Sequence, residues 1–167
     1  NGHRLVVEDS SIGADDAIYT TASEHYHSWA GVQRYGADGG FFGEVFLSTE
    51  YSAGIDIDSH GQVIASSTWR VVRMSTDGTF DESFGGGGYV DNSFAPYTTS
   101  ADALVVDSED RTLVLSNSDV AFRVARFLPD GSHDLSFGED GLIQIDPGYS
   151  RFQAKAIALQ ENGNGFR

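Results

Sequence analysis

Several residue types and patterns are missing from this 167-residue sequence, and each absence excludes a class of structure or chemistry. There is no cysteine, so the chain has no disulfide framework, thiol nucleophile or thiolate zinc site. No apolar run approaches the roughly 18 residues needed to span a bilayer, and no stretch sustains the 3.6-residue period of an amphipathic helix. We therefore expect no membrane insertion and a chain built from strands.

Basic residues are also scarce. Lysine and arginine number 10 against 25 acidic residues, which gives a formal net charge of −15. A field of this sign repels phosphate backbones and anionic membrane surfaces, so we expect no nucleic-acid partner. An acidic surface of this kind keeps an extracellular protein soluble, and calcium binding is the alternative explanation for the excess of carboxylates.

What the sequence does contain is an internal repeat. Residues 69–88 read WRVVRMSTDGTFDESFGGGG, and residues 122–141 repeat them as FRVARFLPDGSHDLSFGEDG. The second half of both copies fits the ungapped pattern DGxxDxSFGxxG, which we call the DG box. Internal similarity at a period of roughly 20 to 50 residues is typical of stacked, identical supersecondary units.

Each repeat unit contains four short segments typical of β-strands. An apolar segment comes first, with small residues where units would converge, and we treat Leu5, Ile55, Leu104 and Ile157 as equivalent positions in it. Three segments rich in Val, Ile, Thr and aromatic residues follow, separated by turns of Gly, Asp and Ser. Repeated four-stranded antiparallel units predict the blades of a β-propeller. A β-sandwich, the alternative all-β fold, has no reason to repeat its turns.

The units predict a single β-propeller segment that covers residues 1–167. Its blades are expected at residues 3–50, 53–91 and 101–146, and a fourth blade is expected to begin at residues 154–167. Three blades do not close a ring, and an open stack leaves strand edges and a sheet face bare at both ends. We therefore expect the remaining blades to come from the same longer chain, of which this would be a piece, or from other subunits.

The repeated residues of the DG box are predicted to have structural roles. The Asp-Gly dipeptide makes a tight turn, because glycine adopts positive φ without steric cost. The second aspartate accepts amide hydrogens from the residues that follow, the phenylalanine turns inward as a wedge between blades, and the next glycine releases the backbone into the last strand. In the two complete boxes these residues are Asp77, Gly78, Asp81, Phe84 and Gly85, and Asp130, Gly131, Asp134, Phe137 and Gly138.

An arginine precedes the second aspartate of each box by eight residues. A hairpin would bring the two together, so we predict ion pairs of Arg73 with Asp81 and of Arg126 with Asp134. In the first unit the box is shortened to DGGFFGEVF and has lost this aspartate, while Arg34 is retained. Calcium in the boxes is the functional alternative, although each box offers only one or two carboxylates and lacks the dense acidic spacing of a known calcium loop.

The pattern RVxRxxxDGxxDxSFGxxG, together with the AxAIALQxxG segment, resembles the delta-60 repeat family of secreted and surface-associated bacterial proteins. The resemblance covers the second and third units and the start of the fourth, and the first unit more loosely because its box is shortened. It implies a β-propeller architecture and an extracellular or cell-surface location in bacteria, and it brings no catalytic residues. The segments HGQVIASS and EDRTLVLS depart from the DGK turn common in the family.

One distinctive segment, SEHYHSW, lies outside the repeat pattern. Its two histidines are two residues apart and would face the same side of an extended strand, where Glu24 or Asp16 would complete a transition-metal site. Its aromatic residues would instead stack on a sugar ring, and an exposed hairpin without a ligand is the third interpretation. These candidate ligand contacts are His25, Tyr26, His27 and Trp29.

No catalytic motif stands out. Asp15 with Asp16, and Asp56 with Asp58, are paired carboxylates of the kind used in glycoside hydrolysis, but turn and strand positions explain them. We thus expect no catalytic residue, no cofactor, and a non-catalytic binding or scaffold module that recognises a protein or a glycan. The alternative is part of a polysaccharide hydrolase or lyase whose catalytic residues converge from several blades.

Overall fold

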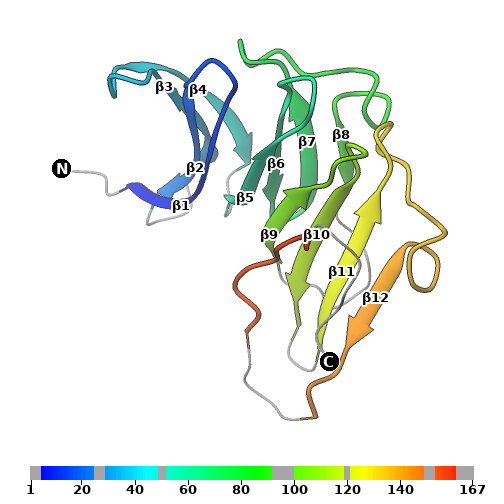
Figure 1. Ribbon diagram of the computed structural model, residues 1–167. Helices are drawn as coiled ribbons and strands as arrows, with labels where there is room; N and C mark the ends of the chain where they lie inside the picture. The colour runs from blue at the N-terminus through cyan, green and yellow to red at the C-terminus, as the bar shows by residue number, and fades with distance from the viewer. Residues whose placement is uncertain are drawn as a thin grey trace.

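Twelve β-strands make up most of the described chain, and they form three four-stranded antiparallel sheets (Figure 1). The computed structural model describes residues 5–24, 29–48, 52–91, 100–118, 121–148 and 153–160. These ranges contain no helix, and hence no helical segment long and apolar enough to cross a membrane. The predicted all-β fold is confirmed.

Each sheet is a meander in which neighbouring strands are also consecutive in the chain. The first sheet contains β1 (Leu5–Ile12), β2 (Ile18–Glu24), β3 (Ala30–Tyr35) and β4 (Phe41–Ser48). The second contains β5 (Ser52–Ile57), β6 (Val63–Ser67), β7 (Arg70–Met74) and β8 (Tyr89–Asp91). The third contains β9 (Ser100–Val106), β10 (Thr112–Asn117), β11 (Phe122–Phe127) and β12 (Leu142–Ile145).

The sheets stack face to face, and a hydrophobic core lies in each of the two gaps between them. The core between the first and second sheets includes Val32 and Met74. The core between the second and third sheets includes Ile64 and Phe127. The strand β6 is buried along its whole length, and it contributes Val63 to the first core and Ile64 to the second. This stacking is the blade arrangement of a β-propeller, and the three sheets do not close into a ring.

The inner strand β5 lies between β1 and β9, and it approaches β9 most closely where both strands have small residues. Gly54 faces the backbone of β9, and a Cβ atom added there would lie 2.3 Å from the Leu104 nitrogen. Ala101 and Ala103 are buried beside it. From the first sheet, the Thr21 hydroxyl donates a hydrogen bond of 2.8 Å to the Ala53 carbonyl. Larger side chains at these positions would force the sheets apart.

The strand pairing corrects one of the predicted equivalences. Ile55 and Leu104 occupy the same place relative to the hairpin turn that ends their strand. The residue at that place in the first sheet is Ser10. Leu5 is therefore not equivalent to Ile55, and that prediction is wrong. The physical reason is that the apolar residues which suggested the equivalence lie at the start of β1, whereas the place that corresponds to Ile55 carries a polar serine.

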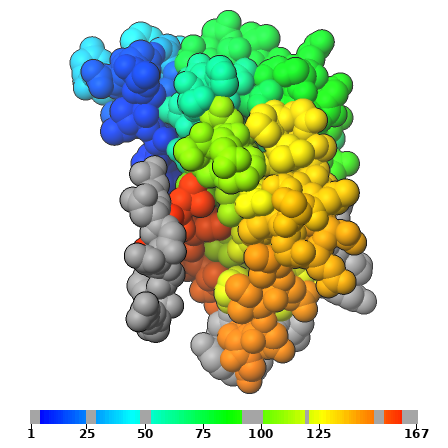
Figure 2. Space-filling model, turned by 45° about the vertical axis from the view of Figure 1, so that its right-hand side comes forward, coloured from blue at the N-terminus to red at the C-terminus, as the bar shows by residue number. Residues whose placement is uncertain are grey.

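Residues 153–160, where a fourth unit was predicted to begin, form no strand in this structure. The Asn117 side chain at the end of β10 holds this segment by two hydrogen bonds of 2.8 Å, one to the carbonyl and one from the N–H of Ala154. The segment, red in Figure 2, consequently lies against the third sheet.

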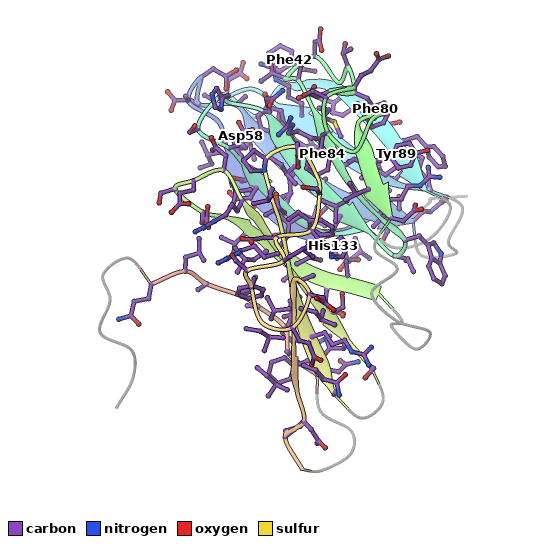
Figure 3. All side chains as sticks on the ribbon, turned by 90° about the vertical axis from the view of Figure 1, so that its right-hand side faces the viewer. Phe42, Asp58, Phe80, Phe84, Tyr89 and His133 are labelled. Carbon is purple, nitrogen blue, oxygen red and sulfur yellow. The ribbon has the colours of Figure 1, made fainter. Side chains whose placement is uncertain are left out.

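The two wedge phenylalanines have different surroundings. Phe84 is 1% exposed and packs in the core between the second and third sheets (Figure 3). Phe137, its counterpart in the second box, is only half-buried, since no described sheet packs on that side of the third sheet. The inward wedge is thus confirmed for Phe84, and its burial depends on the neighbouring sheet.

We predict that the two phenylalanines differ in their contribution to stability. Phe84→Ala should lower the free energy of unfolding by about 3–5 kcal/mol, because it leaves a cavity between two sheets. Phe137→Ala, the matched control at the same place in the repeat, should cost clearly less. Urea unfolding followed by tryptophan fluorescence measures both values, and equal losses would contradict the assigned packing.

Candidate functional site

Arg73 and Asp81 form the ion pair predicted from the repeat. Nε and Nη2 of Arg73 lie 2.9 and 2.8 Å from Oδ2 of Asp81. The other carboxylate oxygen accepts hydrogen bonds from the N–H and hydroxyl of Ser83, at 3.0 and 2.7 Å. The guanidinium also lies over the Phe84 ring, 4.9 Å from its centroid. The prediction that Asp81 caps the turn and pairs with Arg73 is confirmed.

The same arginine joins two sheets. Its Nη1 donates to the carbonyl of Pro129, in the turn that follows β11 of the third sheet. Next to it, the N–H of Gly85 donates to the carbonyl of Asp130 at 2.8 Å. Gly131 fits against Gly85, since a Cβ atom added to Gly131 would lie 2.7 Å from the Gly85 nitrogen. The Asp-Gly turn of one sheet is therefore the contact surface for the box of the preceding sheet.

The second box repeats the local geometry. Arg126 lies 2.8 and 2.7 Å from Oδ2 of Asp134 and stacks over the Phe137 ring at 4.5 Å. Oδ1 of Asp134 accepts hydrogen bonds from the N–H and hydroxyl of Ser136, at 3.0 and 2.6 Å. This ion pair is also confirmed.

The first sheet keeps the arginine and changes its partners. Arg34 donates to the Tyr19 hydroxyl at 3.0 Å and to Asp15 at 2.9 Å. The loss of the box aspartate is thus compensated by a carboxylate from the β1–β2 turn. Asp15 has a structural partner in this arrangement, which removes it from the paired carboxylates considered above.

These contacts keep the box carboxylates ionised. Hydrogen bonds from Ser83, together with those from Gln62 and the charge of Arg73, hold the pKa of Asp81 well below its usual range. Ser136 and Arg126 lower the pKa of Asp134 in the same way. A calcium ion would have to displace these donors, so the boxes are occupied by the protein's own hydrogen-bonding groups.

Of the candidate ligand contacts, the structure places only Trp29. His25, Tyr26 and His27 lie outside the described residues. Trp29 is half-buried at the start of β3, and its ring covers Gly31, where an added Cβ atom would lie 2.8 Å from Cζ2 of the tryptophan. Trp29 therefore packs on its own sheet.

A polar cavity lies along the inner strands, at the side where the three sheets converge. Its volume is about 650 Å³. Residues from β1, β5, β9 and the segment 153–157 line it, and the space is left open because many of them are alanines. The charged lining residues are Glu8, Asp9, Asp102 and Lys155.

Irregular strand pairing directs two of these carboxylates into the cavity. Glu8 and Asp102 are the residues without a partner at the register shifts of β1 and β9, and such bulges re-aim a side chain. Each is anchored by a neighbour: Ser23 donates to Glu8 at 3.0 Å, and the N–H of Asn117 donates to Asp102 at 3.1 Å. The cavity thus offers fixed hydrogen-bond acceptors next to one exposed ammonium group.

The sequence reasoning missed these residues. The segments Ala-Asp-Ala at residues 101–103 and Ala-Lys-Ala at 154–156 carry a charge between alanines at corresponding positions, and this was the available signal.

Asp56, one of the paired carboxylates considered above, bridges strands: its carboxylate accepts hydrogen bonds from the N–H groups of Val106 and Ile57, at 2.8 and 2.9 Å. No acid–base pair is formed with Asp58, which lies in the next hairpin turn.

Comparison with known families supports the propeller architecture. The family described as "Domain of unknown function (DUF5122) beta-propeller" matches residues 61–84 and 110–137. These ranges begin near the end of the inner hairpin turns and run through the DG boxes of the second and third sheets to Phe84 and Phe137. No curated protein matches the chain.

Two solved structures show similar folds at low identity. One is a catalytically inactive virginiamycin B lyase from Staphylococcus aureus with quinupristin (15% identity, TM-score 0.51, covering 73% of this chain and 41% of the lyase). The other is a gluconolactonase from Xanthomonas campestris (18% identity, TM-score 0.51, covering 79% of this chain and 47% of the lactonase). This chain therefore spans less than half the length of either protein, and the likeness concerns the fold.

We predict that the Arg73–Asp81 pair makes stability depend on acid pH. The pKa of Asp81 is lower in the folded state, so its contribution is fully present above the unfolded value of about 3.9 and is lost as the pH falls further. Asp81→Asn should cost roughly 1.5–3 kcal/mol at pH 7 and should flatten the loss of stability below pH 4.

Asp15→Asn, which removes the exposed partner of Arg34, is the matched control and should cost less. Urea unfolding at several pH values between 2.5 and 7 measures both effects. An Asp81→Asn variant with the stability and pH profile of the wild type would contradict the structural role of the pair.

Proposed function

We propose that this chain is a segment of a non-catalytic β-propeller binding module that holds a glycan in its axial cavity. The observation that carries the proposal is the polar cavity itself. Its volume falls in the usual range for small-ligand sites, and its acceptors Glu8 and Asp102 are held in place by the protein. Sugar hydroxyl groups suit such acceptors, and Lys155 supplies a hydrogen-bond donor in the same cavity.

The proposal includes the family, the location and the partners of the protein. The DG boxes and the propeller family that they match support a place among the delta-60 repeat proteins, and with it a secreted or cell-surface location in bacteria. The net charge of −15 argues against a nucleic-acid partner. The face of the third sheet with half-buried Phe137, on which no described sheet packs, is suited to a further blade from the same longer chain or from another subunit.

A glycan array followed by calorimetry tests the binding function. The 167-residue chain should bind at least one glycan class, and Glu8→Gln combined with Asp102→Asn should weaken binding at least tenfold, since each substitution removes charge and acceptor strength from the cavity. Asp91→Asn, at an exposed carboxylate of β8 outside the cavity, should bind like the wild type. Equal affinity for all three chains would refute the axial site, and an empty array would favour a protein partner.

An enzyme acting on polysaccharides is the second candidate. The similar structures include a lyase and a lactonase, and the cavity holds carboxylates from the first and third sheets. Of the described residues of the second sheet, only Ala53 lines the cavity, and no described carboxylate pair shows the contrasting environments that acid–base catalysis uses.

We predict that the chain leaves polysaccharides intact. Reducing-end and unsaturated-product assays on a panel of neutral and acidic polysaccharides should give no signal above buffer. Turnover that disappears in Glu8→Gln or Asp102→Asn would replace the binding function by the enzymatic one.

A further inference from the structure

Two hairpin turns from different sheets meet at one end of the molecule, apart from the residues that line the axial cavity. The turn between β5 and β6 contains Asp58 (labelled in Figure 3) and His60, and the turn between β9 and β10 contains Asp110. Ligand atoms of these three side chains all lie within 4.8 Å of one another. The group mixes two carboxylates with an imidazole, which is a donor set that divalent transition metals bind.

The distance between His60 and Asp110 suits a small ion. Nδ1 of His60 lies 3.3 Å from Oδ2 of Asp110. Bonds of about 2.0–2.1 Å to a tetrahedral zinc ion place two ligand atoms roughly 3.3–3.4 Å apart. The His60 side chain is 74% exposed, so it can rotate toward an ion without disturbing the core.

Asp110 is held in place from the other sheet. The N–H and the hydroxyl of Ser59 each donate to its carboxylate at 2.8 Å. Asp110 adopts φ of 57°, which carries its side chain from the third sheet across to the second. The two hydrogen bonds from Ser59 therefore fix the Asp110 carboxylate beside His60 and Asp58.

Asp58 lacks the arginine partner that the equivalent aspartate of the third sheet has. Asp107 occupies the same place in the third sheet, and its oxygen Oδ2 accepts a hydrogen bond of 2.7 Å from Nε of Arg111. The second sheet has Gln62 in place of that arginine, and Gln62 donates to Asp81 at 2.7 Å instead.

Asp58 is only 7% exposed. Its Oδ1 accepts the N–H groups of His60 and Gln62, at 2.9 and 2.8 Å, and no described residue donates to its Oδ2. This oxygen is therefore available to a cation, beside an imidazole and a second carboxylate.

We propose that Asp58, His60 and Asp110 bind a divalent transition-metal ion, with zinc as the best match to the donor set, and that this ion cross-links the second and third sheets. Three protein ligands leave a fourth position for water or for an atom of a bound partner. The site is independent of the glycan function proposed for the axial cavity.

Calorimetry with zinc chloride on the untagged 167-residue chain tests the site. The wild type should bind one zinc ion at this site, and His60→Ala and Asp110→Asn should each weaken that binding at least tenfold. His60→Ala removes an exposed side chain, so it should fold normally, and circular dichroism without metal checks this. In the wild type zinc should also raise the melting temperature, because it joins two sheets, and this rise should disappear in His60→Ala.

The double variant His25→Ala/His27→Ala is the matched control, because these histidines are the other pair in the chain suited to zinc. It should keep the affinity and the thermal shift of the wild type. Unchanged zinc binding by His60→Ala, or loss of binding in the double variant, would overturn the proposal.

Discussion

The structure depends on the need to cover both faces of each sheet. A strand such as β6 is buried along its whole length, and a four-stranded sheet alone would leave these apolar side chains in water. Stacking supplies the cover, and the cores around Met74 and Phe127 fill the gaps between neighbours. Each sheet is consequently stable only in the company of the next one, as expected when repeat units interact mainly with their neighbours.

Close stacking also determines where chemistry is available. The inner strands approach until backbone meets backbone at Gly54, so side chains at this side of the sheets have little room unless the strand is irregular. The bulges at Glu8 and Asp102 provide such irregularities and direct carboxylates into the axial space. The hairpin turns lie beyond the paired strands, and there Asp58, His60 and Asp110 come together through polar contacts between two turns.

The fold and the DG boxes could be predicted well from the sequence, because both depend on residues close together in the chain and because the same pattern occurs twice. The turn at Asp77-Gly78, the Arg73–Asp81 pair and the inward Phe84 each follow from residue types at short spacing. The axial cavity was missed, since a bulge such as the one at Asp102 arises from long-range pairing and has no signature of its own. The alignment of Leu5 was wrong because the apolar residues lie at the start of β1, and Ser10 occupies the place that corresponds to Ile55. The hairpin cluster was missed because Asp110 reaches Ser59 across two sheets that are distant in sequence.

The polar contact between the second and third sheets uses main-chain acceptors. Arg73 donates a hydrogen bond to the main-chain carbonyl of Pro129, and the neighbouring N–H of Gly85 donates to the main-chain carbonyl of Asp130. Main-chain acceptors are the same in every amino acid, so this polar contact requires a turn of the right shape and no particular side chain. A duplicated or exchanged unit could therefore keep this contact, whereas the apolar core between the sheets still requires side chains that fit one another.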